Sequence, residues 1–180
     1  MSPATIFNLH LCLGYVAWTL CFTTYAWPRL KAMDPIKAHR AIATLHSFRF
    51  FGLVFLVPGL VGPQLPAGFA GFAAYGDLAT GLLALLALLT YRSRPLFWLF
   101  TAAFNVVGIV DLLVTYFHGV TLDLPSRAGE LGATYAIPIL YVPLLMLTHC
   151  AAFYLMVRRN RPETVRSGTV RSMASEPVLD

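Results

Sequence analysis

Charged residues are scarce in this sequence. Asp, Glu, Lys and Arg together make up 12% of the 180 residues, whereas 58% are hydrophobic. A soluble domain usually carries about 25% charged residues. The hydrophobic residues also form long runs and are not spaced at helical intervals, which excludes a soluble helical core. The composition therefore predicts an integral membrane protein.

Other signals are missing as well. The net charge is +5, but no basic stripe is interleaved with aromatic residues, and this excludes nucleic acid as a partner. The three cysteines, Cys12, Cys21 and Cys150, lie in apolar runs without C-x-x-C spacing. We therefore expect neither a disulfide framework nor a metal site. No H-E-x-x-H or G-x-S-x-G motif is present, so the sequence leaves open whether the protein is an enzyme.

Five apolar runs follow one another along the chain. Each is near the ~20 residues that cross about 30 Å of hydrocarbon. The first lacks a basic region before it and a cleavage site after it, which favours a retained span over a signal peptide. The sequence thus predicts an all-α bundle of five transmembrane helices within residues 1–157, with spans at about 6–27, 41–61, 75–91, 95–117 and 135–157. The polar segment 158–180 is predicted to be a disordered cytoplasmic tail.

Basic residues are distributed unevenly between the two sides of the predicted bundle. Arg127 is alone on one side and Arg49 lies inside a span. All others fall on the opposite side, at Arg29, Lys31, Lys37, Arg40, Arg92, Arg94, Arg158, Arg159, Arg161, Arg166 and Arg171. Because cytoplasmic loops are enriched in Lys and Arg, the N-terminus should lie outside and the C-terminus inside. We expect a multi-pass protein of the cell inner membrane.

Several polar residues interrupt the apolar spans. With a helical rise of about 1.5 Å per residue, they separate into two tiers of depth. The inner tier holds His46, Arg49, Asn105 and His149, and the outer tier holds His10, Asp77 and Asp111. A direct contact between Arg49 and Asp111 would have to bridge about 12 Å of depth. A water, Asn105 or a helix kink would then be needed between them.

The fourth span presents a polar stripe, because Asn105, Gly108 and Asp111 recur at every third residue. Gly108 would let a helix or ligand approach closely. Prolines in the second and fifth spans, Pro58, Pro138 and Pro143, should free backbone carbonyls inside the bundle. We therefore predict one pocket, open to the inner or middle layer, whose ligand-binding residues are His46, Arg49, Asn105, Asp111 and His149, with His10 and Asp77 forming a second tier.

Several functions fit such a cluster. The pocket is predicted to bind or process a small lipophilic molecule, with His46, Asp111 and His149 as candidates for proton transfer and Arg49 stabilising an anion. A haem-b electron carrier with His46 and His149 as axial ligands is a second interpretation. A non-catalytic accessory subunit of a membrane complex is a third, and polar residues that only lock helices together are a fourth. Transport would require a homo-oligomer.

Four phrases carry a resemblance to a known group of proteins. They are "HSFRFFGLVFLVPGLVG", "AAYGDLA", "FNVVGIVDLL" and "LGATYAIPILYVPLLMLTHCAAFYL", which cover about half of residues 45–155. In these phrases the chain resembles small bacterial inner-membrane proteins of unassigned function. The resemblance implies a bacterial protein with five spans, and it implies no activity.

Overall fold

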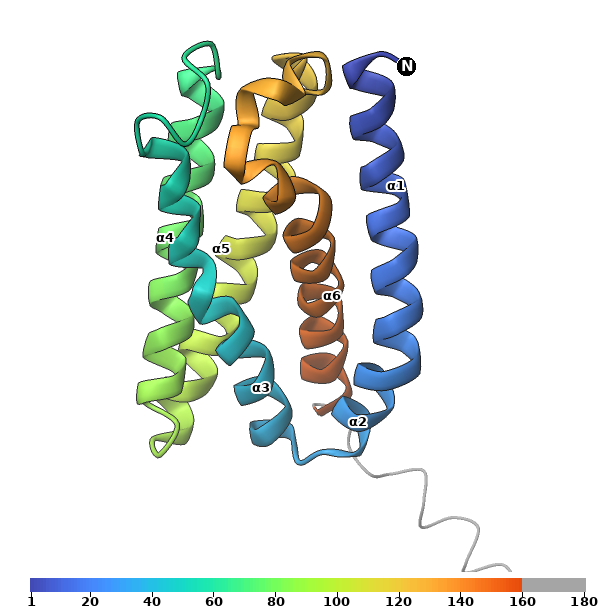
Figure 1. Cartoon of the computed structure of the whole chain (residues 1–180). Helices are drawn as coiled ribbons and strands as arrows, with labels where there is room; N and C mark the ends of the chain where they lie inside the picture. Colours follow the sequence, from blue (N-terminus) through green and yellow to red (C-terminus); the bar gives the residue numbers. More distant parts are fainter. Residues whose placement is uncertain (160–180) are drawn as a thin grey trace, which may run out of the picture.

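The computed structural model describes residues 1–159, and its regular elements in that range are helices (Figure 1). The predicted all-α class is therefore confirmed, while the predicted tail lies, from residue 160 onward, outside the described residues. The elements are α1 (Pro3–Cys21), the π-helix η1 (Phe22–Ala26), α2 (Trp27–Ala32), α3 (Pro35–Ser47), the 3-10 helix η2 (Phe48–Leu56), α4 (Ala67–Leu89), α5 (Arg94–Thr121), the 3-10 helix η3 (Leu124–Tyr135), the π-helix η4 (Ile137–Tyr141) and α6 (Val142–Arg159).

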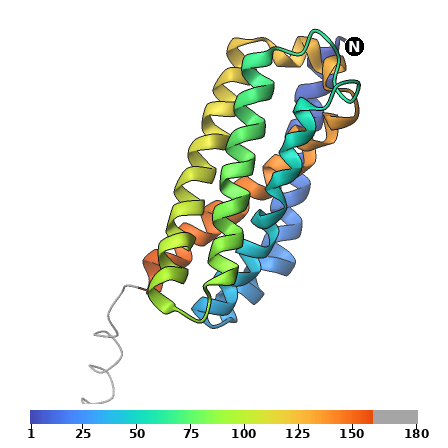
Figure 2. The same ribbon diagram turned by 90° about the vertical axis from the view of Figure 1, so that its left-hand side faces the viewer.

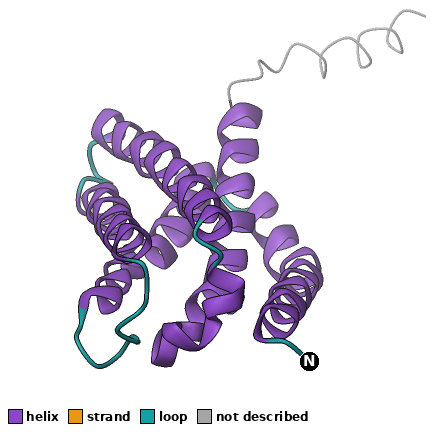
Figure 3. Cartoon of the chain, turned by 90° about the horizontal axis from the view of Figure 1, so that it is seen from above, coloured by secondary structure: helices purple, strands orange, loops and turns teal. Residues whose placement is uncertain are grey.

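The chain passes back and forth between the two ends of an elongated bundle (Figures 1 and 2). Helices α4 and α5 lie side by side, and the α3–η2 segment packs against α4. Seen from above in Figure 3, α1 lies at the edge of the bundle. Helix α1 buries only Phe7 and Gly14. Few of its side chains are therefore held by packing within the chain.

Within residues 1–159, four helical segments are long and apolar enough to cross a membrane, which is consistent with a membrane protein. They are Pro3–Ala32, Ala67–Leu89, Arg94–Thr121 and Ile137–Arg158. The predicted second span, 41–61, does not form one α-helix. It consists of the end of α3, the 3-10 helix η2 and a turn. The predicted span is therefore wrong in helix type, and its last helical residue is Leu56 and not residue 61.

The 3-10 geometry of η2 explains this difference. A 3-10 helix has three residues per turn, so side chains at i and i+3 lie one above another. The buried residues of η2 are Arg49, Gly52 and Phe55, at that spacing, and His46 precedes them by one more turn. Phe48, Phe50 and Phe51 lie on the outside. The tighter helix thus gathers the polar side chains of this segment on one face.

Two predicted loops are partly helical. Helix α4 begins at Ala67 and not near Tyr75, because Phe69, Ala70, Ala73 and Ala74 bury their side chains in the bundle. Segment 118–135 contains the end of α5 and all of η3, and η3 buries Leu124, Ala128, Leu131 and Thr134. In both segments, burial of small and apolar side chains stabilises helical structure that the local sequence does not indicate.

The prolines and cysteines are placed as follows. Pro58 lies in the turn after η2, so the prediction that it frees carbonyls within a span is wrong. Pro138 lies in the π-helix η4 and Pro143 at the start of α6, where the helix geometry departs from regular α. All three cysteines are free and exposed.

The core has two apolar clusters. One contains Phe7, Phe55, Phe69 and Leu131, near the end of the bundle that holds the N-terminus. The other contains Ile42, Phe97, Phe104 and Ala152, toward the opposite end. The buried polar residues of η2, α4, α5 and α6 lie between these clusters along their helices. Each polar group there must find its partners within the protein.

Candidate functional site

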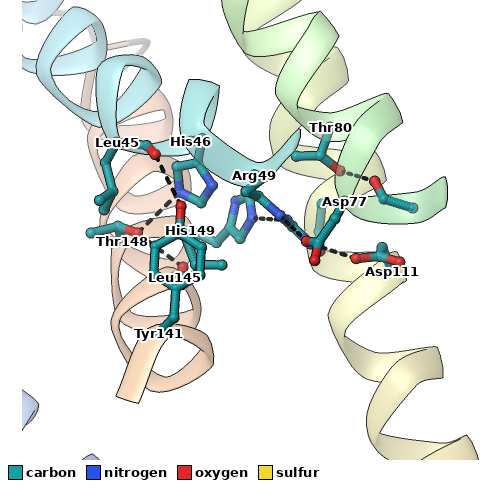
Figure 4. A network of polar contacts seen from close by, with 12 residues as sticks. Leu45, His46, Arg49, Asp77, Thr80, Asp111, Tyr141, Leu145, Thr148 and His149 are labelled. Carbon is teal, nitrogen blue, oxygen red and sulfur yellow. Dashed lines mark hydrogen bonds and ion pairs between the residues drawn. The ribbon is translucent and has the colours of Figure 1, made fainter. Parts of the chain in front are cut away.

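Arg49 is the centre of the polar layer. Its side chain is completely buried, and its Nε donates to Oδ1 of Asp77 on α4 at 2.6 Å (Figure 4). Its Nη2 donates to Oδ2 of Asp111 on α5. One guanidinium therefore joins three elements, because its donors diverge in a rigid fork.

The remaining guanidinium nitrogen, Nη1, begins a chain of hydrogen bonds through His149 and Asn105. Nη1 donates to the carbonyl oxygen of Gly108 and to Nε2 of His149, both at 3.3 Å. Since guanidinium nitrogens only donate, Nε2 must accept and the ring proton must lie on Nδ1. Nδ1 then donates to Oδ1 of Asn105 at 2.9 Å, and Nδ2 of Asn105 donates to the Thr101 carbonyl at 2.8 Å. These bonds make His149 a neutral imidazole.

His46 completes the cluster from the end of α3. The centroids of its ring and of the His149 ring are 4.1 Å apart. The Thr148 hydroxyl donates to backbone carbonyls of its own helix, including that of Leu145 at 2.9 Å. Its oxygen is therefore left to accept from Nε2 of His46, 3.0 Å away (Figure 4). Because Nε2 carries the ring proton, Nδ1 of His46 is the unprotonated nitrogen of a neutral ring, and it is buried without a partner.

Glycines provide the space for these side chains. A Cβ added at Gly108 would lie 2.5 Å from Nε2 of His149 and 2.7 Å from Nη1 of Arg49. A Cβ at Gly76 would overlap the Asp111 carboxylate, and one at Gly52 would overlap that of Asp77. Small residues allow helices in membranes to approach closely, and here they admit charged groups between the helices.

The structure brings together the predicted ligand-binding residues His46, Arg49, Asn105, Asp111 and His149, and adds Asp77 to them. The expected gap between Arg49 and Asp111 is wrong, since the two are in direct contact. Helix α3 begins at Pro35, six residues before the expected start of this span, so Arg49 lies about 9 Å farther along its segment than expected. The long Arg side chain adds to this reach. His10 lies elsewhere, and its Nδ1 is 3.0 Å from the Tyr135 hydroxyl.

Sequence reasoning missed several members of the cluster. Thr101 and Thr148 accept bonds from Asn105 and His46, and Gly52 and Gly76 admit the carboxylates. A usable signal was present for the glycines: Gly76 directly precedes Asp77, and Gly52 follows Arg49 by one 3-10 turn. The threonines carry no comparable signal, because threonine is common in apolar helices.

The histidine pair does not accommodate a haem between its rings. A metal–imidazole bond is about 2 Å long, so two such bonds alone take up about 4 Å, before the halves of the two rings are added. The observed centroid separation is only 4.1 Å. Both ring nitrogens of His149 are also engaged within the protein. Among residues 1–159, no group of three or more His, Cys, Asp or Glu residues is arranged to hold a metal ion.

A cavity of about 110 Å³ lies against one side of the cluster. Asp77, Asp111, Thr115 and Tyr116 line it together with apolar residues of the core near the N-terminus, including Phe7, Phe55 and Phe69. His46, Arg49, Asn105 and His149 do not line it, so Asp111 is the one residue of the five predicted that borders this cavity. The four side chains are fully buried because neighbouring helices close over them.

Two buried oxygen atoms at this cavity have no hydrogen-bond partner. They are Oδ1 of Asp111 and Oγ1 of Thr115, one helical turn apart on α5. Asp111 is 5% exposed, so its second carboxylate oxygen is withdrawn from solvent. An unpartnered buried polar atom is costly, and it marks a place where a missing partner would bind.

Comparison with known proteins gives one result of substance. No curated protein and no solved structure matches the chain. One protein-family model matches residues 6–157, which includes every element that contributes to the polar cluster and to the cavity. The chain therefore belongs to the family described as "Domain of unknown function (DUF8737)".

Proposed function

We propose that the chain crosses the bacterial inner membrane five times, with the N-terminus outside and the C-terminus inside. Residues 35–56, formed by α3 and η2, supply the remaining span, in addition to the four long apolar helices. Thirteen α-helical and nine 3-10 residues extend about 38 Å at their usual rises. That length exceeds the hydrocarbon thickness of about 30 Å.

The positions of the basic residues support this orientation. Helix α2, the start of α3, the α4–α5 connection and the end of α6 lie at one end of the bundle (Figure 1). The described basic residues other than Arg49 and Arg127 belong to these segments. Arg127 lies in η3, at the opposite end with the N-terminus. The end with many arginines and lysines corresponds to the cytoplasmic side.

The function that we propose is the binding of a small lipophilic molecule with a hydrogen-bond donor at its head. One observation carries it: Asp111 and Thr115, each with a buried oxygen that lacks a hydrogen-bond partner, line an otherwise largely apolar cavity. Ligand sites combine apolar walls with a few placed polar groups in this way. A cavity of about 150 Å³ holds benzene, so 110 Å³ suits a head of similar or smaller size.

A groove offers a place for the rest of the ligand. It has a volume of about 480 Å³ and is lined by residues of α1, α3, η2, η4 and α6, such as Trp18, Phe48 and Leu140. Ile137 lines both the groove and the cavity. A molecule entering from the bilayer would keep its tail in the groove and place its head against Asp111.

The polar cluster has a positioning role in this proposal. Arg49 holds one oxygen of Asp111, and the bonds to Gly108 and His149 hold Arg49. The free oxygen is thus an acceptor with a fixed position, which reduces the entropy lost on binding. Of the three candidates for proton transfer, only Asp111 lines the cavity, so it is the only one placed to contact a ligand there.

The test uses dodecanol that carries a photoreactive diazirine near its hydroxyl group. After illumination in a neutral detergent, mass spectrometry should find the label on cavity residues, and unlabelled dodecanol should compete with it. Gly119 lines the cavity, so Gly119→Leu should fill it and abolish the labelling. At Gly71 an added Cβ meets nothing within 4 Å, and Gly71→Leu is the matched control that should retain it. Equal labelling in both variants would overturn the proposal.

A further inference from the structure

The polar cluster beside the cavity contains more carboxyl groups than cationic groups. Among the described residues, the buried Lys, Arg, Asp and Glu side chains are those of Arg49, Asp77 and Asp111. One guanidinium faces two carboxylates. His149 does not offset the difference, because its bond from Arg49 requires an unprotonated Nε2. His46 does not either, because its Nδ1 has no partner that would support a second proton.

We infer that the ligand of this cavity is a lipophilic primary amine, bound as its ammonium ion against Asp111 Oδ1. The inference rests on the proposed binding of a lipophilic molecule and specifies its chemical class. An ammonium group has three donors and no acceptor. One donor satisfies Oδ1 of Asp111 and a second satisfies Oγ1 of Thr115, the two atoms that lack partners.

Charge and shape of the cavity both favour an ammonium ion. Its single positive charge balances the one excess carboxylate, and a buried charge is tolerated only when it is paired. Aromatic side chains of Phe7, Phe55, Phe69 and Tyr116 line the same cavity, and aromatic faces attract cations. A neutral alcohol would satisfy one oxygen but would leave the charge unbalanced.

The experiment compares dodecylamine with dodecanol as competitors of the photoreactive dodecanol, using the full chain in a neutral detergent at pH 7. The amine is protonated there, since a primary amine has a pKa of about 10. We expect dodecylamine to compete about tenfold better than dodecanol, the difference between a charge-assisted and a neutral hydrogen bond. Asp111→Asn should remove this preference.

Two further variants keep the result interpretable. If Asp111→Asn does not fold, Asp77→Asn serves in its place. It also removes the excess carboxyl group but retains that of Asp111, and it should likewise reduce the preference for the amine. Asp123 is an exposed carboxylate outside the cavity, so Asp123→Asn should leave the preference unchanged. A preference that Asp123→Asn removes would indicate attraction of the amine to the protein surface and would overturn the inference.

The remaining outcomes separate the inference from the proposed function. Equal competition by the amine and the alcohol in the unmodified protein would overturn the ammonium assignment and leave lipophilic binding in place. Failure of both compounds to compete would overturn the proposed function itself.

Discussion

Arg49 and Asp111 form a buried ion pair between η2 and α5, although 62 positions of the chain separate them. Asp77 of α4 bonds the same guanidinium from another nitrogen. The charged group inside this apolar segment therefore holds three segments of the chain together. Its removal should affect stability more than any surface charge would.

Arg49→Leu should destabilise the protein by about 3–5 kcal/mol, the range for breaking a buried ion pair by removing one partner. The reason is that two carboxylates would remain buried without a cation. The measurement is unfolding of the purified protein in detergent. Arg127→Leu, at an exposed arginine, is the control and should change stability by less than about 0.5 kcal/mol.

A double variant tests the coupling directly. Arg49→Leu combined with Asp111→Asn should recover part of the loss, since one of the two unpaired carboxylates is removed. The two single effects should therefore not add. Strict additivity would show that the pair contributes no interaction energy and would contradict its role in joining η2 to α5.

Gly108→Ala should destabilise the protein by about 1–3 kcal/mol, as overpacking of a filled core does. The new methyl group would lie 2.5 Å from Nε2 of His149 and would separate the histidine from Arg49. Gly71→Ala, in α4, meets nothing within 4 Å and should be neutral or stabilising by up to about 1 kcal/mol. Unfolding midpoints of both variants provide the comparison, and equal midpoints would contradict the packing described around Gly108.

The purified protein should show no Soret absorption band that depends on the histidine pair. The reason is the 4.1 Å separation of the His46 and His149 rings, which leaves no room for a haem between them. An absorption spectrum of the protein, together with those of His46→Ala and His149→Ala, is sufficient. A band present in the unmodified protein and lost in either variant would restore the haem interpretation.

The proposed topology makes a prediction about η2 in particular. A reporter that is active only in the cytoplasm should be active when fused after Met33 and inactive when fused after Gln64. These positions lie before and after the α3–η2 segment. A fusion after Arg92 should likewise be active, and a fusion after Ser126 should be inactive. Activity at Gln64 would show that α3–η2 turns back without crossing, leaving four spans.

Much of this protein follows from sequence alone. Its composition and its long apolar runs determine the all-helical class, and basic residues near the ends of those runs indicate an orientation. The same reading selected Arg49, Asp111, His149, Asn105 and His46 as polar residues buried among apolar ones. These inferences succeed because hydrophobicity and charge act locally, through the cost of placing each residue in an apolar environment.

Tertiary structure alone decided how those residues meet. The 3-10 geometry of η2 brings Arg49 to Asp77 and Asp111, and it depends on contacts with α4 and α5 that no local pattern encodes. The proton position on His149 and the location of the cavity are likewise set by partners distant in sequence. The helical rise predicts only how far along its own helix a residue lies. Which side chains meet depends on the neighbouring helix, because it determines the close approach at Gly52, Gly76 and Gly108.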